Sequence, residues 1–168
     1  NTDCQVCYTD EIWIRNGVRV NQMNIHRKYS GDIYLHCLPL CIVSPSSAML
    51  RIGLFDDIGD FDESLPACED YDLWLRISMK YEFELINEPL IIKKGGHADQ
   101  LSKKYWGMDR FRVVALKKLL DSNSLEGERL RLTRSELARK CSVLIKGFVK
   151  RGKKEEELHY RTIIKKYS

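Results

Sequence analysis

The chain has 168 residues, of which 43% are hydrophobic, enough for one domain with its own core and an appended helical segment. No apolar run approaches the roughly 18 residues needed to cross a bilayer, and no charged-then-apolar leader opens the chain, so we expect a soluble protein. The first residue is Asn1 rather than Met, which predicts a processed product or an excised fragment. The net charge of +4 combines two unlike parts: residues 1–102 hold 9 Lys and Arg against 16 Asp and Glu, and residues 103–168 hold 19 against 8.

Six cysteines argue against a disulfide scaffold, which would be shorter and denser in Cys. They indicate a reducing compartment, so we expect a cytoplasmic protein. Four of them form two close pairs that a zinc ion could bind, Cys4 with Cys7 and Cys37 with Cys41. The flanking residues lack the glycine that makes the tight knuckle of such sites, and free Cys also serves as a small buried hydrophobe. Both interpretations stay open.

The first elements predicted are those of a β-hairpin. Strand patterns cover residues 5–8 and 11–15, and in the second of these polar and apolar residues alternate as in a half-buried strand. Asn16-Gly17 then separates that strand from residues 18–20. Asn-Gly between alternating apolar residues is the strongest short hairpin signal, so we expect an antiparallel hairpin over 5–20.

A long loop and a buried strand are predicted next. Residues 21–36 are polar with weak periodicity, which is typical of a loop that contacts a ligand. The apolar run 38–43 predicts a buried strand, and we expect extended structure within 38–50. Residues 51–59 indicate one or two helical turns closed by Gly59.

The longest helix of the first part is predicted over residues 70–81. Its apolar residues recur at helical spacing, which assigns Trp74 to the core rather than to a sugar platform. Two strand patterns follow, over 82–86 and 90–92, with Asn-Glu-Pro between them.

From residue 103 the pattern is that of basic amphipathic helices, predicted over 103–120, 130–149 and 155–167. The fold class is therefore α/β: a mixed sheet with flanking helices, followed by an α-helical C-terminal extension. We place the boundary between residues 1–102 and residues 103–168.

Residues 59–76 carry the densest run of carboxylates, in the sequence GDFDESLPACEDYDLWLR. Acids in the first turn of a helix suit the positive end of its dipole and can satisfy free backbone N–H groups. Asp70 or Asp72 could therefore be only a helix cap. A carboxylate cluster of this kind could equally carry out acid–base chemistry.

The same run resembles the acceptor-side motif of family 2 glycosyltransferases, inverting enzymes with the A-type glycosyltransferase fold. In that family a Phe-Asp-Glu loop leads into a helix that opens with Glu-Asp, and this Asp takes the proton from the acceptor hydroxyl. The resemblance implies that Asp70 is the general base. It also implies that Glu69, Asp62 and Ser47 bind the acceptor, a saccharide or a lipid-linked sugar.

His97 follows a Gly-Gly pair, which lets a loop approach a ligand closely. A lone His is most often a hydrogen-bonded structural residue. The resemblance instead implies that His97 contacts the metal or the donor diphosphate, with Mg²⁺ or Mn²⁺ as cofactor in the complete enzyme. An Asp-x-Asp of a nucleotide-binding half would hold that metal and the nucleotide-sugar donor. The resemblance starts after that half and covers residues 5–120. The Asp-x-Asp of this chain, Asp70-Tyr71-Asp72, lies within the acceptor-side motif and is not the metal-binding one.

A second interpretation gives residues 103–168 a non-catalytic binding function. Their positive charge would bind a protein partner, nucleic acid or an anionic membrane at its inner face. Lys and Arg on helices most often form only a solvated surface, and no nucleic-acid motif accompanies them, which argues against nucleic acid. Glycosyltransferase and binding module are both carried forward.

Overall fold

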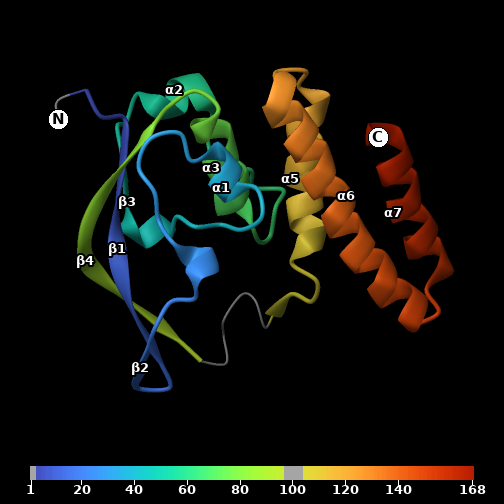
Figure 1. The fold of residues 1–168 in the computed structure, drawn as a ribbon, viewed down its shortest axis with the longest axis horizontal. Coiled ribbons are helices and arrows are strands. Elements are labelled where there is room, and N and C mark those ends of the chain that lie inside the picture. Colours follow the sequence, from blue (N-terminus) through green and yellow to red (C-terminus); the bar gives the residue numbers. More distant parts are fainter. Residues whose placement is uncertain (1–2, 97–103) are drawn as a thin grey trace. The chain divides into compact units, whose positions relative to one another are not determined.

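Figure 1 shows the computed structural model of the chain, which describes residues 3–96 and 104–168. The chain divides into two compact units, Asn1–Tyr105 and Trp106–Ser168. The first unit holds a sheet with short helices, and the second is helical. The predicted α/β class is confirmed.

The sheet of the first unit is built around β1 (Val6–Arg15). β4 (Phe83–Gly95) pairs with β1 in parallel along the whole strand. Two short strands, β2 (Val18–Val20) and β3 (Ala48–Leu50), pair antiparallel with different stretches of β1. Because β4 occupies one edge of β1 throughout, β2 and β3 share the other edge (Figure 1). The predicted mixed sheet is therefore confirmed.

The turn between β1 and β2 is the predicted hairpin. Asn16 and Gly17 both have positive φ, 50° and 80°, the geometry that Asn-Gly favours in a tight hairpin turn. The Asn16 N–H also donates to the Gly95 carbonyl oxygen at 3.2 Å, which ties the end of β4 to the turn. Gly96 has φ 93°, and a Cβ added there would collide with the Asn16 side chain. A residue with a side chain at 96 would therefore disturb this corner.

β4 replaces the two strands predicted on either side of Asn87-Glu88-Pro89. Its register against β1 jumps there, because Thr9 lies opposite Ile86 whereas Asp10 lies opposite Pro89. The extra residues form a bulge, which accommodates a proline without ending the strand. The prediction of two strands is therefore wrong, although the irregularity it detected is real.

β1 likewise joins the strands predicted over 5–8 and 11–15 into one. Its buried residues do not keep the regular spacing of two: Tyr8 is fully buried, and the next buried residue of β1 is Glu11. The change coincides with the register shifts between Thr9 and Asp10 and between Asp10 and Glu11. The sheet thus contains a buried acid.

No strand forms over 38–43, so that prediction is wrong. The expected loop 21–36 ends in a short helix, α1 (Tyr34–Cys37), and the extended segment within 38–50 is β3. Leu38, Ile42 and Val43 are nevertheless buried. An apolar run reports burial but does not by itself distinguish a strand from other buried backbone.

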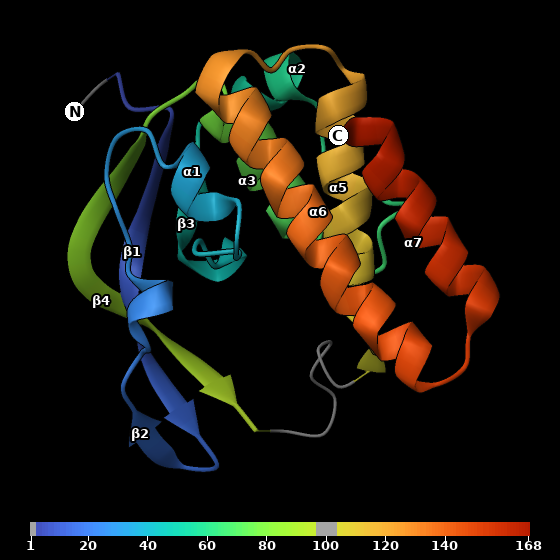
Figure 2. The same ribbon diagram turned by 45° about the vertical axis from the view of Figure 1, so that its right-hand side comes forward.

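Two 3-10 turns and two further helices lie in the described part of the first unit. η1 (Asn24–His26) lies in the expected loop, η2 (Pro45–Ser47) precedes β3, and α2 (Leu54–Ile58) ends at Gly59 as predicted. α3 (Glu69–Ser78) is slightly shorter than the predicted 70–81. Figure 2 shows α1 and α3 on the same side of the sheet.

α3 contributes the largest buried side chain. Trp74 is 1% exposed and packs edge-on against Phe83 of β4, with ring centroids 6.2 Å apart. Tyr8 of β1 contacts the same ring at 6.0 Å. The prediction that Trp74 belongs to the core is confirmed, and this packing holds α3 against the sheet.

The second unit consists of α5 (Asp109–Asp121), α6 (Gly127–Lys150) and α7 (Lys154–Tyr167). These match the three predicted helices, with the first beginning later than residue 103. α6 packs against both of its neighbours. Lys140 of α6 is 1% exposed, and its ammonium lies 2.9 Å from Glu136 Oε1 and 3.4 Å from Asp109 Oδ1. A buried cation needs such partners. Among the described helices, none combines the length and apolar character that a bilayer crossing requires.

Candidate functional site

The start of α3 is held in an unusual backbone conformation. Cys68, the residue before the helix, has φ 64° and ψ 20°, in the left-handed region that residues with a side chain rarely adopt. Its carbonyl oxygen accepts the first helical hydrogen bond, from the Asp72 N–H at 3.1 Å. Left-handed backbone at a non-glycine residue costs roughly 1–2 kcal/mol and occurs often at functional sites. This conformation of Cys68 sets the position of Glu69 and Asp70 at the start of the helix.

Asp70 is partly buried and contacts a thiol. Its Oδ1 accepts a hydrogen bond from the Tyr71 N–H at 2.7 Å, and its Oδ2 accepts one from Cys41 Sγ at 3.4 Å. Burial raises the pKa of the Cys41 thiol well above its usual value, and the charge of Asp70 raises it further. The thiol therefore stays protonated and donates to Asp70 without adding a charge.

Asp72, the third carboxylate in the first turn of α3, is structural. Asp72 is 1% exposed, and its Oδ2 accepts a hydrogen bond from Arg76 Nε at 2.9 Å. The same guanidinium donates to the carbonyl oxygens of Ile58 at 2.6 Å and Asp60 at 2.8 Å. Asp72 and Arg76 thus fasten the acidic loop, residues 59–68 between α2 and α3, to α3. Sequence reasoning did not single out Arg76, although the i, i+4 spacing from Asp72 is typical of helical ion pairs.

The predicted acceptor-binding residues occupy different surroundings. Glu69 is partly buried at the first position of α3. Asp62 Oδ1 accepts hydrogen bonds from the Ser64 N–H at 2.9 Å and the Ser64 hydroxyl at 2.6 Å, which orders the acidic loop. Ser47 is buried, and its hydroxyl donates to the Ser44 carbonyl oxygen at 2.8 Å. Their roles toward an acceptor stay predictions.

His97 lies outside the described residues. Whether it shares a cleft with Glu69 and Asp70 therefore stays a prediction. The six cysteines are free thiols. Within residues 3–96 and 104–168, no three His, Cys, Asp or Glu side chains come together as a metal site would require. Cys4 donates to the Val6 carbonyl oxygen at 3.2 Å. The single S–H of Cys41 is shared between Asp70 Oδ2 and the Val43 carbonyl oxygen, which lies 3.2 Å from Sγ.

A cluster of polar residues that the sequence did not reveal includes Ser44, which follows Cys41 closely in the chain, and three of its four members are buried. Glu11 Oε1 accepts a hydrogen bond from the Ser44 hydroxyl at 3.0 Å and lies 2.8 Å from the Lys28 ammonium. The side chains of Lys28 and Glu11 are only 4% and 2% exposed. Lys93 of β4 donates to the Ser44 hydroxyl at 2.8 Å. We call Glu11, Lys28, Ser44 and Lys93 the polar cluster.

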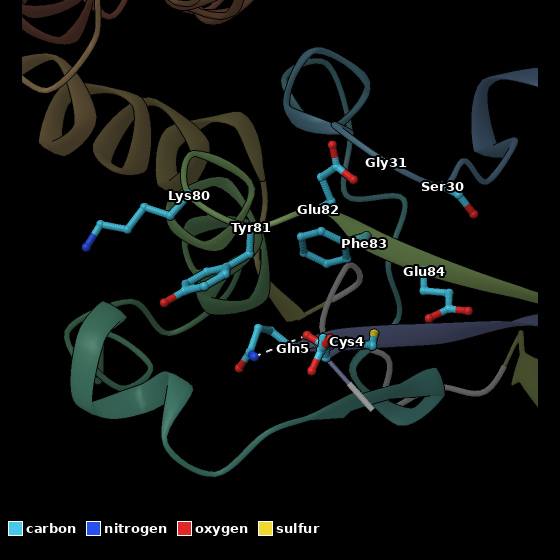
Figure 3. Close-up of a pocket in the computed structure, with 10 residues that line it drawn as sticks. Cys4, Gln5, Ser30, Gly31, Lys80, Tyr81, Glu82, Phe83 and Glu84 are labelled. Atoms are coloured by element: carbon cyan, nitrogen blue, oxygen red, sulfur yellow. Dashed lines mark hydrogen bonds between the residues drawn. The ribbon is translucent and has the colours of Figure 1, made fainter. Parts of the chain in front are cut away.

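The cavity shown in Figure 3 lies at the other end of α3 and is not the predicted site. It measures about 410 Å³ and is lined by the starts of β1 and β4, with Lys80 and Tyr81 just after the helix. Asp3, Glu82 and Glu84 make its wall acidic. α3 has 10 residues, so roughly 15 Å separates its two ends, and none of the predicted site residues lines this cavity.

Part of the chain matches known proteins. It is 36% identical over 76 residues to an uncharacterized glycosyltransferase of Rickettsia felis, and 35% identical over 76 residues to one of Rickettsia conorii. It is also 33% identical over 77 residues to an uncharacterized glycosyltransferase of Rickettsia bellii. Its relatives are named glycosyltransferases.

These matches cover 44–45% of this chain and only 11–12% of each relative, so the chain spans a small part of their length. No protein-family model matches the chain. No solved structure matches it either.

Proposed function

We propose that the chain is the acceptor-side part of a glycosyltransferase and that Asp70 is its general base. The observation that carries the proposal is the placement of Asp70 at the strained start of α3, with a protonated thiol beside it. The names of the relatives support a glycosyltransferase at a general level. The acidic run 59–76 supports the assignment to family 2 and to the A-type fold.

In the proposed reaction Asp70 takes the proton of an acceptor hydroxyl. The hydroxyl oxygen forms a bond to the anomeric carbon of the donor sugar as the bond from that carbon to the nucleoside diphosphate breaks. Attack from the side opposite the leaving group inverts the anomeric centre. The diphosphate leaves with the bonding electron pair, and Asp70 returns its proton to solvent. Glu69 and Asp62 would orient the acceptor, and Ser47 would help to bind it.

The start of α3 suits this role for two reasons. The positive end of the helix dipole favours the ionised form of a carboxylate in the first turn. The Cys41 thiol adds a neutral donor that orients one carboxylate oxygen without forming an ion pair with it.

A divalent metal and the positive tail belong to the same proposal. No three His, Cys, Asp or Glu side chains of the described residues come together, so we derive no step through Mg²⁺ or Mn²⁺. Contact of His97 with such an ion remains our proposal for the complete enzyme. The positive charge of residues 103–168 supports a peripheral contact with an anionic membrane at its cytoplasmic face.

The test is a transfer assay with the longest natural form of the chain and a nucleotide-sugar donor. Asp70→Asn keeps the shape of the side chain and removes the base, so we expect transfer to fall by about 10²–10⁴-fold with unchanged donor binding. Asp57→Asn is the matched control, because Asp57 is an exposed acid of the neighbouring α2. Near-normal transfer by Asp70→Asn would remove the proposed mechanism.

A further inference from the structure

A second cavity of the first unit lies beside the β-hairpin. It measures about 380 Å³ and is enclosed by β1, β2, the η1 loop and the end of β4. Three cationic residues line it, Arg15, Lys93 and Lys94, and no Asp or Glu is among the described residues of its wall. A cavity of this size suits a small polar ligand, and the charge of its lining favours an anionic one.

One wall of the cavity is aromatic. The rings of Trp13 and His26 lie with centroids 4.9 Å apart at 56° to each other, and both residues line the space. Burial lowers the pKa of His26, and the nearby Lys93 lowers it further, so the imidazole is neutral near pH 7. A neutral ring beside an indole offers an apolar surface to the C–H face of a sugar.

Lys93 brings a cation to this aromatic wall. Its ammonium lies 5.1 Å from the Trp13 ring centroid and donates to the Ser44 hydroxyl. Ser44 in turn donates to Glu11, whose charge is balanced by Lys28 at 2.8 Å. The polar cluster therefore fixes the direction of the Lys93 side chain through a neutral hydroxyl. It does not neutralise the ammonium by direct ion pairing within the described residues.

We propose that this cavity binds a sugar that carries a phosphate group, with the sugar ring on Trp13 and His26 and the phosphate on Lys93 and Arg15, which lie on the same face of the sheet as Trp13. The proposal rests on the proposed function and extends it, because it predicts that the glycosyltransferase substrate bound by the first unit carries an anionic group. Two substrates share this chemistry: an acceptor sugar linked to a lipid through phosphate, and the nucleotide-sugar donor. Residues 41–44 join the cavity to the start of α3, because Cys41 contacts Asp70 and Ser44 contacts Lys93.

The experiment is calorimetric titration of the 168-residue chain with glucose 1-phosphate, glucose and inorganic phosphate. We expect glucose 1-phosphate to bind at least about tenfold more tightly than either fragment, because it engages both walls. Equal affinity for glucose and glucose 1-phosphate would overturn the proposal. Titration with UDP separates the two substrates: tighter Lys93-dependent binding of UDP assigns the cavity to the donor, and weaker binding assigns it to the acceptor.

The chain offers a matched control pair. Lys153 lies over Trp106 at 5.9 Å in the second unit, much as Lys93 lies over Trp13. Lys93→Gln should weaken glucose 1-phosphate binding by about tenfold, as should Trp13→Leu, whereas Lys153→Gln should leave it unchanged. Equal losses in Lys93→Gln and Lys153→Gln would show nonspecific charge binding and overturn the proposal.

Binding and transfer fail separately. If glucose 1-phosphate binding proves independent of Lys93 while Asp70→Asn still abolishes transfer, the cavity assignment is wrong and the proposed function stands. If binding follows Lys93 while Asp70→Asn transfers normally, the general-base mechanism is wrong and the cavity stands. Circular dichroism of Trp13→Leu checks its fold, and Lys93→Gln, which alters an exposed side chain, decides the outcome if that variant unfolds.

Discussion

Arg76→Met should destabilise the first unit strongly, because it leaves a buried carboxylate without its cation. Asp72 has a side chain 1% exposed, whereas that of Arg76 is 21% exposed. Removing one partner of a buried ion pair typically costs 3–5 kcal/mol, and the partial exposure of Arg76 places our expectation at about 3 kcal/mol. The Asp60 carbonyl oxygen is exposed, so water can replace its lost hydrogen bond at little further cost, whereas the hydrogen bond to the Ile58 carbonyl oxygen is partly buried.

A loss of about 3 kcal/mol corresponds to a fall in melting temperature of roughly 12 °C or more for a domain of this size. Tryptophan fluorescence during thermal and urea unfolding is the assay. Of the three tryptophans only Trp106 lies in the second unit, so a Trp106→Phe background makes the signal specific for the first. A melting temperature within 2–3 °C of the parent would refute the reasoning, since it would mean that Asp72 needs no cation.

The double variant Asp72→Leu/Arg76→Met provides the internal check. Replacing both members of a buried pair by apolar side chains of similar size is often nearly neutral, so the double variant should recover most of the stability lost in Arg76→Met. Lys80→Met is the surface control. Lys80 and Asp57 are 54% and 43% exposed, and we expect no measurable change in the unfolding midpoint when their ion pair is removed. If the stability loss of Asp72→Leu/Arg76→Met equals the sum of the losses of Asp72→Leu and Arg76→Met, the buried ion pair does not explain the loss in Arg76→Met.

Lys140→Met should lower the stability of the second unit by about 2–3 kcal/mol, because Glu136 and Asp109 lose their shared buried cation. The loss is measured by helical circular dichroism during urea unfolding. The control is Lys146→Met, at an exposed position of α6. Burial raises the pKa of the Cys37 thiol to about 12, so its contribution to stability is full below the usual thiol pKa of about 8.5 and is lost as pH rises toward 12. The urea midpoint should therefore fall between about pH 8 and pH 10, and less so in Cys37→Ala; an unchanged midpoint in the parent would contradict the raised pKa.

Local patterns determined the elements with strong short-range signals. Asn16-Gly17 specified the hairpin because few other residue pairs accept positive φ at both turn positions. The apolar spacing of α3 specified a helix that buries Trp74, and Gly59 specified the end of α2. The candidate base Asp70 was also visible in the sequence, since the acidic run that carries it is contiguous.

Pairing and charge compensation were decided only by the tertiary structure. The apolar run 38–43 could have paired as a strand, but among the described residues the partners of β1 on that edge are β2 and β3. Leu38, Ile42 and Val43 are buried without forming a strand. Glu11 of β1 lies beside Lys28 and Ser44 only because the fold brings these segments together. These residues lie 17 and 33 positions from Glu11 in the chain, so no local periodicity relates them. A local sequence pattern fixes backbone preference over a few residues, whereas a buried charge must find its partner wherever the fold brings one within hydrogen-bonding distance.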